Sequence, residues 1–123
     1  MNSTQIGFIA EYQFLLELLK NEYHLAIPCG DTKGYDLVVE TKKGWKTIQI
    51  KTAIKANVSY KRQTGKRVVM GQRYKKGSFD FLIIVNREND AYWVFSQDEV
   101  LGKWSVYATP DSPAYMDLDK LDK

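Results

Sequence analysis

Two short apolar segments separated by a tight turn constrain the fold of this 123-residue chain most strongly. The first covers residues 34–40 (GYDLVVE), and the second covers residues 47–53 (TIQIKTA). The Lys42-Lys43-Gly44 turn lies between them. Short apolar runs that are rich in Val and Ile and bounded by such a turn are typical of strands. We therefore predict strands at roughly residues 35–41 and 45–54 that pair as a hairpin.

The polar residues of this hairpin are predicted to gather at one place. Residues i and i+2 of a strand point to the same face, so Gln49 and Lys51 project together. Ile48 and Ile50 then project into the opposite layer. If the strands pair, Asp36 comes beside Gln49 and Lys51. A carboxylate, an amide oxygen and an ammonium group then surround one point, which can hold a hard divalent cation next to a phosphate.

The order of these residues resembles the PD-(D/E)xK nuclease superfamily. Its motif is an Asp, a strand-turn-strand and then (D/E)-x-K, often with a Glu on the preceding helix. Here Gly7-x-x-x-Glu11 lies on a predicted first helix, and residues 27–31 (IPCGD) precede the strand of Asp36. The order looks like that of the small group I intron-type homing endonucleases, in which Gln replaces the acidic residue. Archaeal Holliday-junction resolvases are similar in layout.

The resemblance implies a restriction-endonuclease-like fold and a DNA endonuclease that hydrolyses phosphodiester bonds with Mg²⁺ or Mn²⁺. Asp36 would be the principal metal ligand, and Gln49 would add its side-chain carbonyl. The backbone carbonyl of Ile50 is a further ligand by this resemblance. Glu11 would restore negative charge from the helix, directly or through water. Lys51 would orient the attacking water or stabilise charge on the phosphate.

Three alternatives remain open at this point. A Holliday-junction resolvase would read DNA shape rather than sequence. Gln49 also departs from the usual acidic residue, which marks either the Gln-containing subgroup or a site that binds DNA without cutting it. In the second case the chain is a non-catalytic nucleic-acid-binding module on a nuclease fold. A structural protein with no nucleic-acid role is the third reading.

Positive charge is concentrated in the middle of the chain. No acidic residue lies between Glu40 and Asp80, and that interval holds twelve of the eighteen Lys and Arg residues. Basic residues next to a metal site favour a polyanion as partner, so we predict DNA binding here. The predicted DNA-binding residues are Lys55, Lys61, Arg62, Lys66, Arg67, Arg73, Lys75 and Lys76.

The remaining pattern predicts a mixed α/β domain in the order α-β-β-β-(basic insert)-β-β-α. A first helix should run to about Tyr23, with Ile6, Ile9, Gln13 and Leu16 on one apolar stripe, which Leu15, Leu18 and Leu19 widen and which has Glu11 at its edge. Residues 24–27, 80–85 and 91–95 read as strands, and a short helix opens near Ser96. Residues 60–70 read as a hairpin. We expect one domain over residues 1–108, followed by an acidic tail at 109–123 that is extended or frayed.

Composition limits the location and assembly of the protein. No apolar run approaches the length of a membrane span, the longest being residues 81–85, and the N-terminus lacks a signal-peptide pattern. The single cysteine, Cys29, excludes an intrachain disulfide and favours a reducing, cytoplasmic compartment; we expect it to be buried. Cutting two strands needs two active sites, so we predict a homodimer or larger. The tail or the edge at residues 91–95 would form its interface. No small-molecule cofactor is expected.

Overall fold

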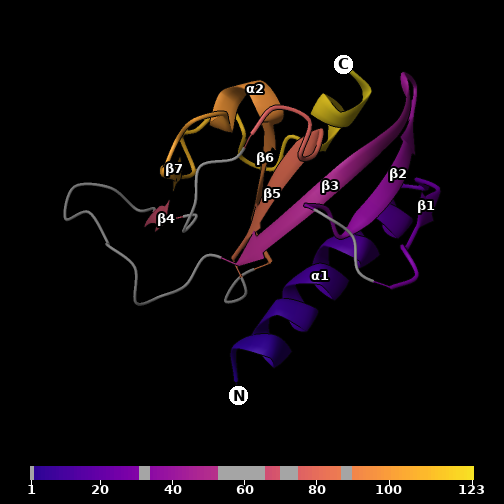
Figure 1. Ribbon diagram of the computed structural model, residues 1–123, viewed down its shortest axis with the longest axis horizontal. Coiled ribbons are helices and arrows are strands. Elements are labelled where there is room, and N and C mark those ends of the chain that lie inside the picture. Colours follow the sequence, from indigo (N-terminus) through magenta and orange to yellow (C-terminus); the bar gives the residue numbers. More distant parts are fainter. Residues whose placement is uncertain (1, 31–33, 53–65, 70–74, 87–89) are drawn as a thin grey trace.

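A five-stranded sheet crossed by one long helix forms the centre of the molecule (Figure 1). The structure is a computed structural model of residues 1–123 and describes all of them except 1, 31–33, 53–65, 70–74 and 87–89. The elements are α1 (Ser3–Lys20), β1 (Leu25–Ala26), β2 (Leu37–Thr41), β3 (Gly44–Thr52), β4 (Lys66–Val69), β5 (Phe81–Val85), β6 (Tyr92–Ser96), α2 (Gln97–Val100), β7 (Ser105–Ala108) and the 3₁₀ helix η1 (Leu118–Asp122).

The sheet has the mixed topology that the sequence pattern predicts. Its strand order is β1-β2-β3-β5-β6, and β3 and β5 are parallel while the other neighbours are antiparallel. The predicted hairpin of residues 35–41 and 45–54 is confirmed as β2 and β3, with Leu37 opposite Ile48. Strand β4 pairs with β7, a strand later in the chain, and the first half of the hairpin predicted at residues 60–70 lies outside the described residues.

Helix α1 begins with a reciprocal cap. The Asn2 side chain accepts a hydrogen bond from the Gln5 N–H, and the Gln5 side chain accepts one from the Asn2 N–H, each at 2.9 Å. Such a box satisfies two of the amide groups that a helix start leaves unpaired. The helix ends at Lys20 rather than near Tyr23, because Glu22 adopts a positive φ of 63° that interrupts it.

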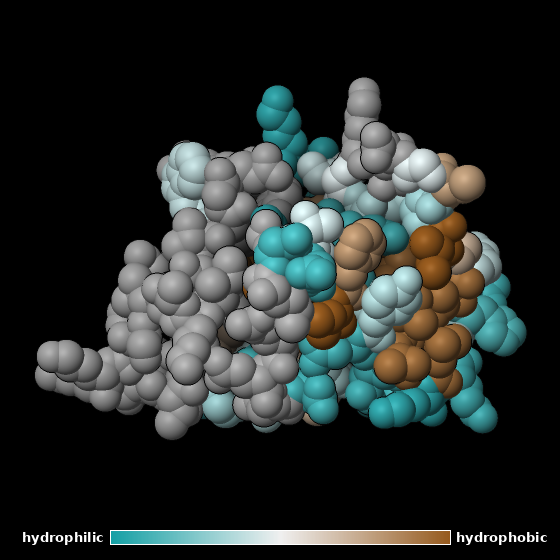
Figure 2. All heavy atoms as spheres, turned by 90° about the horizontal axis from the view of Figure 1, so that it is seen from below, coloured by the Kyte–Doolittle hydropathy of each residue, from teal (hydrophilic) through white to brown (hydrophobic). Residues whose placement is uncertain are grey.

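The helix presents a different face to the core than the stripe predicts. Ala10, Phe14 and Leu18 are buried against the sheet, whereas Ile9 and Leu16 are exposed. The predicted stripe is therefore wrong at its centre, although Leu18, which widens it, is buried as expected. Because α1 carries apolar residues on nearly every side, their spacing alone did not single out the buried face. Hydrophobic residues gather on the surface where α1 lies (Figure 2).

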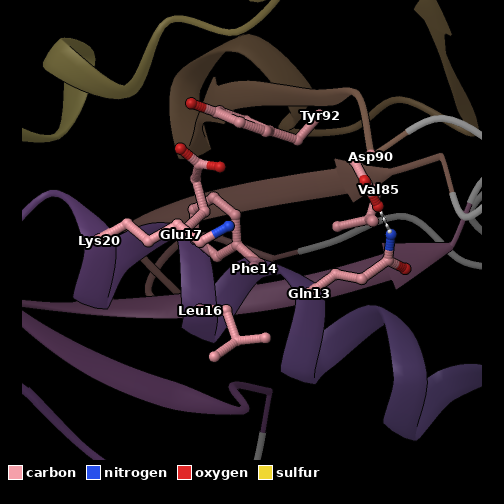
Figure 3. A pocket seen from close by; sticks show the side chains of 8 residues that line it. All are labelled: Gln13, Phe14, Leu16, Glu17, Lys20, Val85, Asp90 and Tyr92. Carbon is pink, nitrogen blue, oxygen red and sulfur yellow. Dashed lines mark hydrogen bonds between the residues drawn. The ribbon is translucent and has the colours of Figure 1, made fainter.

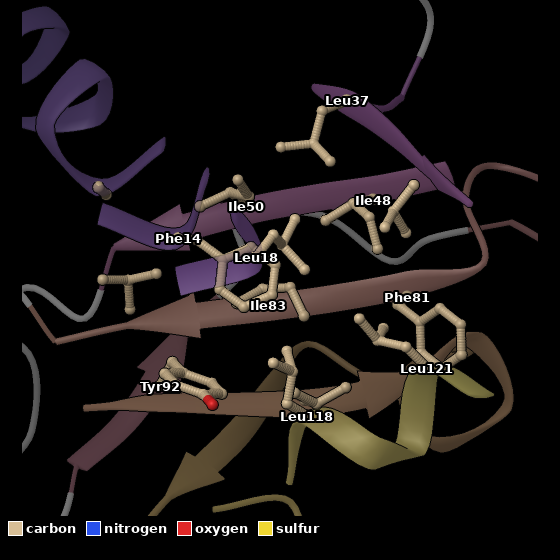
Figure 4. Packing of buried hydrophobic residues seen from close by; sticks show 14 residues of the cluster. Phe14, Leu18, Leu37, Ile48, Ile50, Phe81, Ile83, Tyr92, Leu118 and Leu121 are labelled. Carbon is tan, nitrogen blue, oxygen red and sulfur yellow. The ribbon is translucent and has the colours of Figure 1, made fainter. Parts of the chain in front are cut away.

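Two apolar clusters fill the space on either face of the sheet. The first joins α1 and η1 to the sheet through Phe14, Leu18, Ile48, Ile83 and Leu121, among others (Figure 4). The second covers the opposite face, where residues of α2 and β7 pack on the sheet. Strand β5 contributes to both and is buried along its whole length, which confirms the prediction for residues 81–85.

The C-terminal segment packs onto the domain. Leu118 and Leu121 are buried in the first cluster, so the expectation of a frayed tail is wrong. The Val94 N–H donates to the Ala114 carbonyl at 2.9 Å, and the Met116 N–H donates to the Tyr92 carbonyl at 2.8 Å. This segment thus covers the β6 side of the sheet. The expectation that this tail or the edge at residues 91–95 forms the interface with a partner stays a prediction.

Candidate active site

Asp36 lies directly before β2 and is fixed against β3 by two hydrogen bonds. Its N–H donates to the Ile48 carbonyl at 2.7 Å, and its Oδ2 accepts from the Ile50 N–H at 2.8 Å. The carboxylate thus accepts from a backbone N–H of β3 that lies beyond the last β2–β3 residue pair, Leu37 and Ile48. A hydrogen bond of this charge-assisted kind is worth about 1.5–3 kcal/mol. The side chain is therefore held in place before any ligand arrives.

Glu11 reaches the same point from α1. Its side chain is partly buried, and burial raises the pKa of the carboxyl group above its ordinary value. The negative charge of Asp36 raises this pKa further, as does a side-chain hydrogen bond between the two residues. Two acidic groups in such contact disfavour simultaneous ionisation. The structure thus brings together the two carboxyl groups that the sequence placed on a helix and a strand far apart along the chain.

Gln49, Ile50 and Lys51 follow one another on β3. The Ile50 side chain is buried in the cluster under α1, so Gln49 and Lys51 point to the opposite face, and both are partly buried. Gln49 is the next residue after the Leu37–Ile48 pair and is therefore level with Asp36. Since the N–H and carbonyl of one strand residue point to the same edge, we expect the Ile50 carbonyl on the Asp36 side.

A glycine that sequence reasoning did not single out positions Asp36. Gly34 has a φ of 95°, and a Cβ at this residue would lie 2.8 Å from the Ser78 carbonyl oxygen. Ser78 is held in turn by its hydroxyl and its N–H, which both donate to the Lys75 carbonyl. The segment that leads into Asp36 therefore passes tightly over the turn before β5. The contact of Gly34 with Ser78 is hard to predict from the sequence, because the two residues are distant in the chain.

The donors at this site fit a hard divalent cation. The charge of Asp36 disfavours ionisation of Glu11, and a bound cation would offset that repulsion. Neither here nor elsewhere does the described part of the chain contain a group of three or more His, Cys, Asp or Glu side chains that could hold a metal ion, so other oxygen atoms would have to complete the ligand set. The sequence prediction assigns this task to the amide oxygen of Gln49, which is level with Asp36 in the strand register, and to the Ile50 carbonyl.

The predicted DNA-binding residues are only partly described. Lys75 and Lys76 are exposed, close to the turn at Ser78. Lys66 and Arg67 belong to β4, where their backbones pair with Ala108 and Tyr107. The other four, Lys55, Lys61, Arg62 and Arg73, lie outside the described residues.

The remaining candidate residues lie apart from this site. Cys29 is exposed, which corrects the expectation that it is buried. His24 is exposed, and its Nδ1 lies 3.4 Å from Glu40 Oε1. In the described ranges, 2–30, 34–52, 66–69, 75–86 and 90–123, no helix is long and apolar enough to cross a membrane.

A hollow of about 240 Å³ lies between α1 and the β5–β6 strands (Figure 3). Gln13 lines it and donates from Nε2 to Asp90 Oδ1 at 2.7 Å. Burial, followed by the charge of Glu17, raises the pKa of Tyr92 in its wall to about 12. None of the residues of the Glu11–Asp36 site lines this hollow, so it is a separate feature of the molecule.

Comparison with known proteins agrees with this fold. A family model described as PD-(D/E)XK endonuclease matches residues 1–111. The solved structure of the bacterial homing endonuclease I-Ssp6803I is similar, with a TM-score of 0.67 and 22% sequence identity over 91% of this chain and 82% of that chain. At that identity the likeness concerns the fold. No curated protein matches the chain.

Proposed function

Because the chain belongs to the PD-(D/E)XK endonuclease family, as its residue pattern predicts, we propose that it is a metal-dependent DNA endonuclease of the homing type. The observation that supports this best is the contact between the carboxyl groups of Glu11 and Asp36, beside the Ile50 N–H. If this carboxyl pair bound no ligand, it would only destabilise the fold at neutral pH, because two like charges lie close together. A cation-binding site explains why the pair is there.

Each residue of the site has a separate task in this proposal. Asp36 and Glu11, with the oxygens of Gln49 and Ile50, would hold Mg²⁺ or Mn²⁺. When bound, such an ion polarises the scissile phosphate and lowers the pKa of a coordinated water. The Ile50 N–H keeps the Asp36 carboxylate in one orientation, as hydrogen bonds to metal ligands generally do. Burial and the neighbouring Asp36 raise the pKa of Glu11, and a bound cation would favour the charged form of its carboxyl group.

Lys51 is the cationic member of the site. From the same face of β3 as Gln49, its ammonium group would stabilise negative charge on the phosphate or orient the attacking water. The concentration of basic residues between Glu40 and Asp80, of which Lys75 and Lys76 are exposed, supports DNA as the substrate. Cleavage of both strands would need two such sites, which a homodimer or larger assembly supplies.

The test is a cleavage assay with three kinds of DNA: a four-way junction, a supercoiled plasmid and a duplex library of random sequence. Reactions contain Mg²⁺, Mn²⁺, Ca²⁺ or a chelator. We compare the native chain with Lys51→Ala and with Lys46→Ala, a control on the same strand that lies close to the β2–β3 turn. The native chain and the control should cut duplex in Mg²⁺ or Mn²⁺, and Lys51→Ala should be slower by about 100-fold or more.

Each other result contradicts part of the proposal. Cleavage that persists in chelator, or that Lys51→Ala leaves unchanged, would contradict the assigned site. Selective cleavage of the four-way junction would identify a resolvase instead of a homing-type enzyme. Binding to all three substrates without cleavage would indicate a non-catalytic nucleic-acid-binding module.

A further inference from the structure

The outward face of α1 carries an unusual number of exposed apolar side chains. Five large residues form one continuous strip, which we call the outer stripe: Phe8, Ile9, Tyr12, Leu16 and Leu19. Their exposed fractions range from 40% for Ile9 to 60% for Tyr12. Their spacing of three and four residues places them on a single side of the helix. Figure 2 shows hydrophobic residues gathered on this side of the molecule.

The opposite face of the same helix is already buried. Ala10, Phe14 and Leu18 are at most 1% exposed and pack on the sheet. A helix that is apolar on all sides is normally enclosed on all sides. The outer stripe therefore has the composition of a contact surface, whereas a helix on the free surface of a monomer would carry polar residues there.

The stripe is well suited to contact with a copy of itself. Phe8 and Leu16 lie at equal distances in sequence on either side of Tyr12. If two α1 helices cross in antiparallel fashion at Tyr12, each Phe8 packs against Leu16 of the second copy. Antiparallel alignment also brings opposite ends of the two helix dipoles together. No charged side chain belongs to the stripe, so the contact brings no like charges face to face.

The size of the stripe agrees with such a contact. At the observed exposures, its side chains present roughly 450 Å² of surface, or about 900 Å² when two copies pair. Stable interfaces bury about 1,200 Å² or more, so the stripe and a modest rim of neighbouring residues reach that size. Of the exposed large apolar side chains in the described part of the chain, five lie on this one face of α1.

We propose that the outer stripe is the surface on which a second copy of this chain docks, through a two-fold, antiparallel contact between α1 helices centred on Tyr12. The inference rests on the proposed function in one respect, since cleavage of two strands calls for two sites. Glu11 is next to Tyr12 in sequence, so this contact places the two candidate active sites on either side of one axis. The outer stripe therefore lies on α1, the same helix that carries the site residue Glu11.

The first test measures the mass of the full chain by analytical ultracentrifugation, without DNA or metal. We compare the native chain with Tyr12→Glu and with Ile27→Glu, a control at a residue that is 63% exposed and lies outside α1. Circular dichroism confirms that each variant is folded. The native chain and the control should have twice the monomer mass or a multiple of it. Tyr12→Glu should raise the Kd of association by about 100-fold or more, because it buries an unpaired charge.

A second test locates the two-fold axis. Tyr12→Cys in a Cys29→Ser background should form a disulfide-linked dimer on mild oxidation, because the axis brings the two Cα atoms together. Lys42→Cys, at the β2–β3 turn, should not. A monomeric native chain, or a dimer that survives Tyr12→Glu and yields no link through Tyr12→Cys, would overturn the proposal. Neither test needs nuclease activity, so a dimer that cuts no DNA would count against the proposed function alone.

Discussion

Carboxylates at the two ends of the β2–β3 hairpin have opposite surroundings. Near the turn, Asp122 accepts hydrogen bonds from the Tyr23 hydroxyl at 2.7 Å and from the Lys42 N–H at 2.9 Å. The bond from Tyr23 is the main reason that the pKa of Asp122 is lowered. At the other end, burial and the neighbouring Asp36 raise the pKa of Glu11.

The difference separates carboxylates that stabilise the fold from those that are available to a ligand. The two donors to Asp122 come from the segment that follows α1 and from the β2–β3 turn, so this acid of the C-terminal segment ties three parts of the chain together. Glu11 and Asp36 instead oppose one another, and Asp36 accepts a hydrogen bond from the Ile50 N–H. Uncompensated negative charge of this kind is typical of functional sites.

The largest expected effect comes from the same substitution at each end. Asp36→Asn keeps an oxygen for the Ile50 N–H and removes the charge beside Glu11, so stability should stay equal or rise slightly. Its cleavage rate should fall by about 100-fold or more, because a charged metal ligand is lost. Asp122→Asn should keep its cleavage rate and lose about 1 kcal/mol of stability. Urea unfolding and cleavage kinetics measure both quantities, and equal losses of stability would contradict the comparison.

A smaller effect on stability is expected at two glycines, Gly34 before this hairpin and Gly44 at its turn. Gly34 and Gly44 have nearly the same φ, 95° and 99°, but a Cβ meets the Ser78 carbonyl at Gly34 and nothing within 4 Å at Gly44. Both Ala variants incur about 1–2 kcal/mol of backbone strain. The free energy of unfolding of Gly34→Ala should fall by about 1 kcal/mol more than that of Gly44→Ala, because Ser78 must move.

Cleavage kinetics sharpen this second comparison. Displacement of Ser78 would also shift the segment that leads into Asp36, so Gly34→Ala should cleave more slowly than Gly44→Ala. Equal free energies of unfolding and equal cleavage rates for the two variants would show that the contact with Ser78 does not position the site.

The sequence predicted the parts of this site that depend on strand alternation and short turns. The β2–β3 hairpin, the all-buried β5 and the single face shared by Gln49 and Lys51 follow from a period of two and a glycine turn. The contact of Glu11 with Asp36 was suggested by family resemblance. The residue pattern itself placed Glu11 only at the edge of an apolar stripe, and that stripe proved to be the wrong one.

Features that depend on distant contacts escaped prediction. Apolar residues on both faces of α1 concealed which face is buried. The Asp residues of the C-terminal segment concealed Leu118 and Leu121, whose burial shows only when that segment lies against the sheet. The fit of Gly34 over Ser78 and the pairing of β4 with β7 join residues far apart in the chain. Local propensity carries no information about such partners.

The smallest effect is a difference in pH dependence, with opposite signs at the two ends. The pKa of Asp122 is lowered from 3.8, so its stabilisation is present above that pH and is lost as the pH falls through the lower value of the folded state. The pKa of Glu11 is raised from 4.5, so its contribution is present below that pH and is lost as the pH rises through the higher value of the folded state.

Urea unfolding from about pH 3 to about pH 7 would detect both slopes. Relative to the native chain, Glu11→Gln should gain stability as the pH rises above 4.5, because the variant has no charge to oppose Asp36. Asp122→Asn should lose relative stability as the pH rises through the region below 3.8, where the native carboxylate ionises. If the relative stability of the two variants changed in the same direction with pH, both acids would have the same effect on the fold. Opposite slopes would identify the Glu11 end as the one where the fold retains negative charge at a cost in stability.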